Sequence, residues 1–444
     1  MPGGIPFGSL AWGLPFVGLL LTLAIAPLSV PEIWGRHYGK IVAGWALVFV
    51  LPDLFAEGAG GAGTRLLDMG LNTYLPFVLL LGSLFVITGG LRIRGAPHAS
   101  PGVNTALLAI STAVASCIGT PGASLLMLRP LVRANRHRAK AAHVYVFFIF
   151  LVCNVGGALT PLGNPPLFLG YLRGVPFFWP MTHLYLPTLS LSAVLLAVFY
   201  AIDRYVDGRE HPPPALPEIE KLSIDGAVNL LLLAGAAATM MLRTYWPVPG
   251  EIKIFGVGWA LDDVLSDVLF LALALLSLKL TRKATRQENA FVWTPIVEVS
   301  ILFAAIFVTL IPVDVMMAAG KDGPAAALFA RMFVAGSPDN TLFYLLPGAL
   351  SSVLDNAPAY LVFFGLAGDD AKLLTTQLPL TLAAISAGAS YFGAMTYIGN
   401  APNLMVKSIV ESYGVRMPNF FAYAGWAAIC LLPWLLAVML IFYR

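Results

Sequence analysis

Long apolar stretches alternate with short polar segments along almost the whole chain. A helix that crosses the hydrocarbon core of a bilayer needs roughly 20 mainly apolar residues, so the pattern predicts an all-α polytopic membrane protein with about ten transmembrane helices. We expect these helices at residues 10–30, 39–55, 70–92, 141–173, 182–202, 226–243, 260–280, 291–313, 374–407 and 420–443.

Two further apolar stretches are interrupted near the middle by helix-breaking residues. Residues 103–133 contain GTPG starting at Gly119, and residues 340–367 contain DNAP starting at Asp355. At about 1.5 Å per residue, each half is too short for a hydrocarbon core of ~30 Å. We therefore expect two re-entrant hairpins whose tips lie inside the membrane, where protein or a cavity satisfies the irregular backbone.

A repeat with an offset of 236 residues relates the two halves of the chain. Residues 157–166 read GALTPLGNPP and residues 393–402 read GAMTYIGNAP, so six of ten positions are identical. Each segment also interrupts a predicted span, and we expect both helices to be unwound there. The pattern predicts a first repeat at 1–205, a proline-rich cytoplasmic linker at 206–225 and a second repeat at 226–444.

Composition and charge agree with this class. With 58% hydrophobic and 11% charged residues, the chain cannot be a soluble globule, and a formal charge of +3 does not support nucleic-acid binding. Of the 26 Lys and Arg residues, 18 fall in one set of predicted loops and 8 in the other. Because short cytoplasmic loops carry the positive excess, both termini should lie outside, and the two repeats should have inverted topology.

Helix breaks at matching places in two halves of a membrane chain indicate a transport site. We expect the two tips and the two unwound segments to converge near the middle of the membrane, where backbone groups released from the helices bind an ion or a small anion. The candidate binding residues are Gly119, Thr120, Thr160, Gly163, Asn164, Asp355, Asn356, Thr396, Gly399 and Asn400, with Ser116, Asn154 and Ser352 as secondary ligands.

The two repeats differ at the tips, where Asp355-Asn356 replaces Gly119-Thr120. An acid inside a membrane is costly and is a functional candidate by default, so Asp355 is expected to bind a cation, a proton, or both in turn. It also suits a helix N-cap, a role that can coexist with binding. Glu298 lies in another apolar run and is either a second proton carrier or a structural carboxylate.

The motifs Gly163-Asn164-Pro-Pro, Leu354-Asp355-Asn356-Ala-Pro and Gly399-Asn400-Ala-Pro-Asn403 resemble those of the ion transporter superfamily, particularly its citrate-transporter-like proteins and NhaD-type sodium/proton antiporters. The resemblance covers nearly the whole chain. It implies a homodimer in the bacterial inner membrane, with two re-entrant hairpins and a transport domain that moves against a scaffold. Dicarboxylate carriers of the superfamily have Ser-Asn-Thr at both tips, and this chain does not.

Three functions follow from these observations. A secondary cation/proton antiporter fits the acid at the tip, with Na⁺ held by Asp355, Asn356, Asn164 and Asn400 and with H⁺ as the counter-ion. An organic-anion or oxyanion carrier of citrate type fits the same fold, with helix N-termini in place of basic side chains. A channel or a membrane enzyme is the third, although no nucleotide-binding loop or metal-ligand cluster supports catalysis, and no cofactor is expected.

Overall fold

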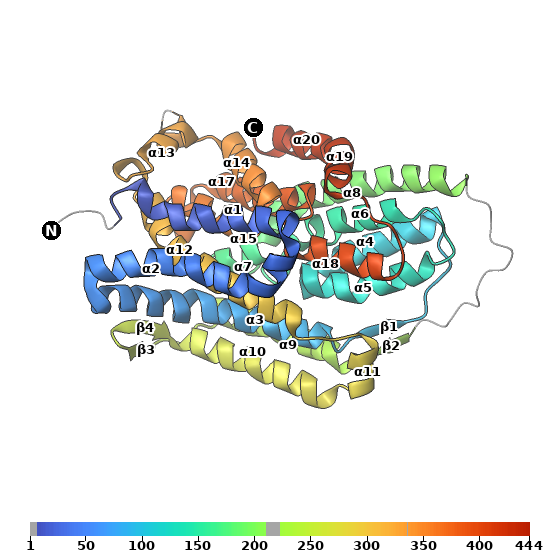
Figure 1. Cartoon of the computed structure of the whole chain (residues 1–444), viewed down its shortest axis with the longest axis horizontal. Coiled ribbons are helices and arrows are strands. Elements are labelled where there is room, and N and C mark those ends of the chain that lie inside the picture. The colour runs from blue at the N-terminus through green and yellow to red at the C-terminus, as the bar shows by residue number, and fades with distance from the viewer. Residues whose placement is uncertain (1–6, 210–222, 335) are drawn as a thin grey trace.

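The computed structural model describes residues 7–209, 223–334 and 336–444, which are mainly helical (Figure 1). Residues 1–6 of the first predicted repeat and 210–222 of the predicted linker lie outside these ranges. Helices in the first half are η1 (Leu10–Gly13), α1 (Leu14–Ser29), α2 (Pro31–Met69), η2 (Gly70–Tyr74), α3 (Leu75–Thr88), α4 (Pro101–Ile118), α5 (Thr120–Ala134), α6 (Ala142–Leu151), η3 (Val155–Gly157), α7 (Pro165–Leu172) and α8 (Trp179–Asp207).

The second half is also helical. Its helices are α9 (Val228–Tyr245), α10 (Leu261–Leu280), α11 (Lys283–Glu288), α12 (Thr294–Ala318), η4 (Gly320–Asp322), α13 (Ala326–Met332), α14 (Asn340–Val353), α15 (Asn356–Leu366), α16 (Ala371–Thr376), α17 (Pro379–Tyr391), η5 (Phe392–Met395), α18 (Ala401–Ser412), α19 (Phe420–Cys430) and α20 (Leu432–Phe442).

Three short antiparallel strand pairs join some of these helices. They are β1 (Arg92–Arg94) with β2 (Ser223–Asp225), β3 (Glu251–Ile254) with β4 (Val257–Ala260), and β5 (Phe333–Val334) with β6 (Ser337–Pro338). The first pair gathers with α11 at one end of the molecule, and β3 and β4 lie at the opposite end (Figure 1). The basic segments at 92–94 and 282–286 therefore share one end, as the loop assignment from charge predicts.

Six helical runs in the described residues are long and apolar enough to cross a membrane, or seven if α19 and α20 form one span bent by 41°. The sequence prediction of about ten is higher for structural reasons. The predicted spans 141–173 and 374–407 are broken into pieces shorter than a full crossing, residues 31–88 form one continuous helical run by this measure, and α10, at the predicted span 260–280, is not among the six. Conversely, α4 (Pro101–Ile118) is among the six, although it was expected to be too short to cross as one half of a hairpin. The all-α membrane class is confirmed, whereas the number of crossings stays a prediction.

The helical run from Pro31 to Thr88 differs from the expected loop between residues 55 and 70. Gly58 has φ 73° and ψ 172°, so α2 consists of two helices joined at this residue. The glycine-rich segment after it is helical rather than a loop. An ion pair of 2.5 Å between Arg65 and the buried Asp53 ties the two helices together, a tertiary contact that the local composition does not reveal.

Both interrupted stretches form two helices separated by a break. Gly119, with φ 82°, separates α4 from α5, and Leu354-Asp355 separates α14 from α15. The two predicted unwound helices are also present, because non-helical residues separate η3 from α7 and η5 from α18. The first unwound segment begins earlier than expected, since α6 already ends at Leu151.

The helices pack as two groups, and each group contains helices from both halves of the chain. The first group consists of α1, α2, α3, α9, α10 and α12, which contact one another. The second contains α4 to α8, α14, α15 and α17 to α20, in which α14 packs on α17, α7 on α15 and α5 on α18. Contacts of α12 with α15 and of α3 with α5 join the groups (Figure 1).

Candidate functional site

A cavity of about 550 Å³ lies where the two helix groups meet. The first group contributes residues of α1, α2, α3 and α12, and the second contributes both tips and both unwound segments. Six of the residues singled out from the sequence line it, namely Gly119, Gly163, Asn164, Glu298, Asp355 and Asn400. The arrangement places the four helix breaks around one space.

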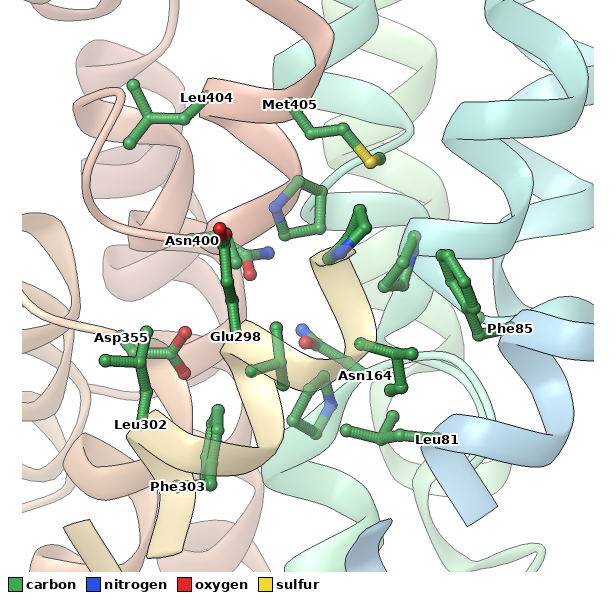
Figure 2. A pocket seen from close by; sticks show the side chains of 18 of the residues that line it. Leu81, Phe85, Asn164, Glu298, Leu302, Phe303, Asp355, Asn400, Leu404 and Met405 are labelled. Atoms are coloured by element: carbon green, nitrogen blue, oxygen red, sulfur yellow. The ribbon is translucent and has the colours of Figure 1, made fainter. Parts of the chain in front are cut away.

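Two carboxylates face this cavity from opposite helix groups. Asp355 lies at the tip between α14 and α15, and Glu298 extends from α12 (Figure 2). The Asp355 carboxylate accepts a 3.1 Å hydrogen bond from the backbone N–H of Ala357, so it caps α15 while it lines the cavity. Capping uses one oxygen and leaves the carboxylate able to bind a cation or a proton.

The other predicted site residues lie behind the cavity wall, and Thr160 and Thr396 have equivalent roles there. The Thr160 hydroxyl donates to the carbonyl of Ser116, and the Thr396 hydroxyl donates to the carbonyl of Ser352 over 2.6 Å. Each bond ties an unwound segment to the tip in its own half of the chain. Because their protons are committed to the backbone, these threonines position the tips.

The serines at the ends of α4 and α14 complete the same ties. Ser116 donates to the carbonyl of Gly156, and Ser352 donates to the carbonyls of Gly348 and Phe392. Gly156 and Phe392 are themselves separated by the repeat offset. The serines predicted as secondary ligands therefore hold the backbone that leads into each unwound segment against the end of α4 or α14.

The glycines retained in both repeats allow each unwound segment to fold back on itself. A Cβ atom on Gly163 would lie 2.2 Å from the carbonyl oxygen of Gly157, and one on Gly399 would lie 2.6 Å from that of Gly393. Real Cβ atoms do not approach backbone this closely, so only glycine fits. The repeated spacing is thus explained by backbone geometry.

One hydrogen bond connects a tip to the unwound segment of the other half. The side-chain nitrogen of Asn356 donates to the side-chain oxygen of Asn164 over 2.8 Å, and both residues are buried. The corresponding pair, Thr120 and Asn400, has no such bond among the described residues. Three buried polar atoms here have no hydrogen-bond partner within the described part of the chain: Thr120 Oγ1, Asn164 Nδ2 and Asn356 Oδ1.

Three further asparagines form a buried cluster next to this pair. Asn400 donates to the carbonyl of Cys153 over 2.7 Å and to Oδ1 of Asn154 over 3.1 Å. Asn154 in turn donates to Oδ1 of Asn403 over 3.0 Å. Asn403 was not among the predicted ligands, although its position three residues after Asn400, at the start of α18, was a usable signal. Its amide also satisfies the carbonyls of Gly393 and Thr396.

The ionisable side chains of the cavity are acids. Besides Asp355 and Glu298, the described lining residues are uncharged, with no Lys, Arg or His among them. Most of the wall is apolar and comes from residues such as Leu23, Leu84 and Phe303. These apolar residues were not singled out from the sequence, because nothing in their chemistry distinguishes them from residues that face lipid.

Comparison with known proteins adds one match. The model of a family described as "Putative citrate transport" matches residues 7–443, nearly the whole chain. No curated protein matches the chain.

Proposed function

The chain belongs to that citrate-transport family, and on this premise we propose that it is a secondary active transporter that exchanges Na⁺ for H⁺ across a bacterial inner membrane. The observation that carries the proposal is the position of Asp355. Its carboxylate lies at a helix break, lines the cavity between the two helix groups, and has no basic side chain beside it among the described lining residues.

The surroundings of Asp355 suit a small cation. Behind the cavity wall, Asn356 Oδ1 on the neighbouring residue and Thr120 Oγ1 at the other tip are buried oxygens without a hydrogen-bond partner in the described residues. Unwound backbone carbonyls at such breaks supply further oxygen ligands in transporters. A carboxylate with neutral oxygens is the ligand set that a hard cation such as Na⁺ prefers.

Competition for one carboxylate gives a simple exchange mechanism. Asp355 holds either Na⁺ or a proton, and the occupied site becomes accessible from one side of the membrane at a time. The second helix group carries all four breaks, so we assign it the moving role and treat α1, α2, α3, α9, α10 and α12 as the scaffold. Glu298 on α12 then belongs to the scaffold side of the cavity.

Citrate transport is the second candidate, and two observations favour it. The description of the matching family names citrate transport. In addition, α5, α7, α15 and α18 all begin at the tips or breaks, and helix N-termini attract anions. Asn164 Nδ2 also offers a buried donor. Against this, a citrate trianion would have to approach two carboxylates, and like charges at close range repel strongly in a medium of low dielectric.

The deciding experiment uses proteoliposomes that contain a pH-sensitive dye and are exposed to gradients of Na⁺, Li⁺, K⁺ or citrate. We expect Na⁺ to drive proton movement in the native protein and Asp355→Asn to abolish it. Asn is also a good N-cap residue, so this variant should fold. The matched control is Asp370→Asn, because Asp370 caps α16 in the same way but lies on an exposed loop away from the cavity.

Asp370→Asn should exchange ions at the native rate. Uptake of labelled citrate without any proton movement in response to Na⁺ would replace the antiporter with the anion carrier. Flux that does not saturate and needs no counter-ion would identify a channel.

A further inference from the structure

A second, much smaller cavity lies where α7 meets α9 and α10. Its volume is about 10 Å³, close to the space that one water molecule needs. Apolar side chains such as Phe168 and Phe270 form most of its wall, and the charged side chains among its described lining residues are Asp263, Asp267 and Arg243. The cavity therefore accepts a single small ion or water molecule and excludes an organic ligand.

The two acids of this cavity lie one turn apart on α10, and both are buried. Asp263 is 8% exposed and Asp267 is 4% exposed. Residues i and i+4 of a helix share one face, so both carboxylates are on the same side of α10. Asp263 belongs to the first turn, where the helix dipole favours an anion, whereas Asp267 lies beyond that turn. The dipole therefore does little to stabilise a charge on Asp267.

Among the described residues, Asp263 has a basic partner and Asp267 has none. Arg243 of α9 lies 2.5 Å from the Asp263 carboxylate. Both side-chain oxygens of Asp267 are buried without a hydrogen-bond partner in the described part of the chain. Two carboxylates and one guanidinium leave one negative charge uncompensated in the described lining. A buried charge without a partner is strongly destabilising, so a cation or a proton has to neutralise it.

The undescribed residues do not change this charge balance. Residues 210–222 precede β2, which lies at the opposite end of the molecule from β4, the strand directly before α10 (Figure 1). Residues 1–6 and 335 have no acidic or basic side chain. The charge of the cavity is therefore set by Asp263, Asp267 and Arg243.

We propose that Asp267 and Asp263 bind one monovalent metal cation of the size of Na⁺ in this cavity. One positive charge balances the cluster, whereas a divalent cation would leave it positive. Carboxylate and hydroxyl oxygens are the hard ligands that such a cation prefers. Tyr171 lines the cavity, and its hydroxyl donates to the carbonyl of Met240 over 2.7 Å, so its oxygen keeps lone pairs that can accept a cation. Because α7 belongs to one helix group and α9 and α10 to the other, the bound cation strengthens the contact between the groups.

This site is separate from Asp355 and does not depend on the exchange proposed above. It is tested on full-length protein that carries Asp355→Asn, so that the Asp355 carboxylate contributes nothing. The melting temperature is measured in detergent while Na⁺ replaces choline at constant ionic strength, and bound radioactive Na⁺ is counted in parallel. We expect a saturable rise in Tm with Na⁺, because a ligand that binds the folded protein stabilises it.

Two substitutions test the charge balance. Asp267→Asn, added to Asp355→Asn, should abolish both the rise in Tm and the bound Na⁺. Asp263→Asn should do the same, because Arg243 can then neutralise Asp267 without a metal. The matched control is Asp262→Asn, because Asp262 is the neighbouring acid on α10 but does not line the cavity. It should keep the full response to Na⁺.

The outcomes that reject the site are distinct. Absence of a Na⁺ response in the Asp355→Asn protein, or an equal response after Asp267→Asn is added, overturns the proposal. A Tm that falls as the pH rises in choline, becomes independent of pH after Asp267→Asn and never responds to Na⁺ shows that a proton neutralises Asp267, and it rejects the metal site. Exchange by the native protein is measured separately in proteoliposomes, so a failure of the exchange proposal leaves this result unaffected.

Discussion

Asn356 and Asn164 are 192 positions apart in the chain, yet the side-chain nitrogen of Asn356 lies 2.8 Å from the side-chain oxygen of Asn164. The bond joins the tip between α14 and α15 to the unwound segment before α7. It also leaves Asn164 Nδ2 and Asn356 Oδ1 facing no described partner. The pair therefore links the two halves of the chain and offers both a donor and an acceptor to a ligand.

A double-mutant cycle tests this link. Asn164→Ala and Asn356→Ala should each lower the free energy of unfolding by about 1–3 kcal/mol, because each leaves a buried polar partner unsatisfied. In the double variant, the free energy of unfolding should fall by about 1 kcal/mol less than the sum of the two single effects. Denaturant unfolding in mixed micelles measures these free energies. Combining Asn164→Ala with Asn419→Ala, which removes an exposed cap of α19, should be additive. If the effects of Asn164→Ala and Asn356→Ala on the free energy of unfolding are additive, the hydrogen bond between the two side chains is contradicted.

Glu298→Gln separates the roles of the two cavity carboxylates. Because Asp355 remains to bind Na⁺ or H⁺, we expect the variant to exchange ions more slowly than the native protein without losing exchange. Initial rates in the proteoliposome assay, compared with those of Asp355→Asn, measure this. Complete loss of proton movement with Na⁺ binding retained would instead make Glu298 the proton carrier.

The packing of α14 on α17 depends on Gly388. A Cβ atom there would lie 2.2 Å from the backbone carbonyl oxygen of Tyr344, so Gly388→Ala should separate the helices and lower the free energy of unfolding by about 1–3 kcal/mol. Gly425 is also helical, but a Cβ atom there would meet nothing within 4 Å. Gly425→Ala should therefore leave stability unchanged or raise it by up to about 1 kcal/mol. Equal changes in the free energy of unfolding for Gly388→Ala and Gly425→Ala would show that helix propensity, and not the close contact with Tyr344, determines the effect of the substitution.

Membrane orientation can be tested at the two ends of the molecule. Phe255, between β3 and β4, and Lys283, in α11, are exposed at opposite ends (Figure 1). With Cys117, Cys153 and Cys430 replaced, Phe255→Cys should react with a membrane-impermeant maleimide in intact cells. Lys283→Cys should react only after permeabilisation, because its end carries the basic loops. The reverse labelling pattern would invert the predicted topology.

Some features of the site could be read from the sequence because they depend on local chemistry. Gly119, Asp355 and the two Gly-Asn-x-Pro segments were predicted as helix breaks, and the structure has a break at each. The turn at Gly58 and the bend between α19 and α20 were not predicted, because neither stands out in composition from other glycine-containing or apolar stretches of the chain.

The roles of the polar residues at the breaks depended on packing. Thr160 and Thr396 looked like ligands, but their hydroxyls bind the carbonyls of Ser116 and Ser352. Asn403 belonged to a recognised motif but was not predicted as a ligand, yet it completes the buried asparagine cluster.

By itself, the sequence determined that the chain is a helical membrane protein, that helices break at Gly119, at Asp355 and at the two Gly-Asn-x-Pro segments, and where its two halves differ, since these follow from the residues at each position. Only the tertiary structure decided that Asp355 lines the cavity and that Asn356 reaches Asn164. A hydrogen bond between residues so far apart exists only after the helices have packed, and the partners are chosen by that packing.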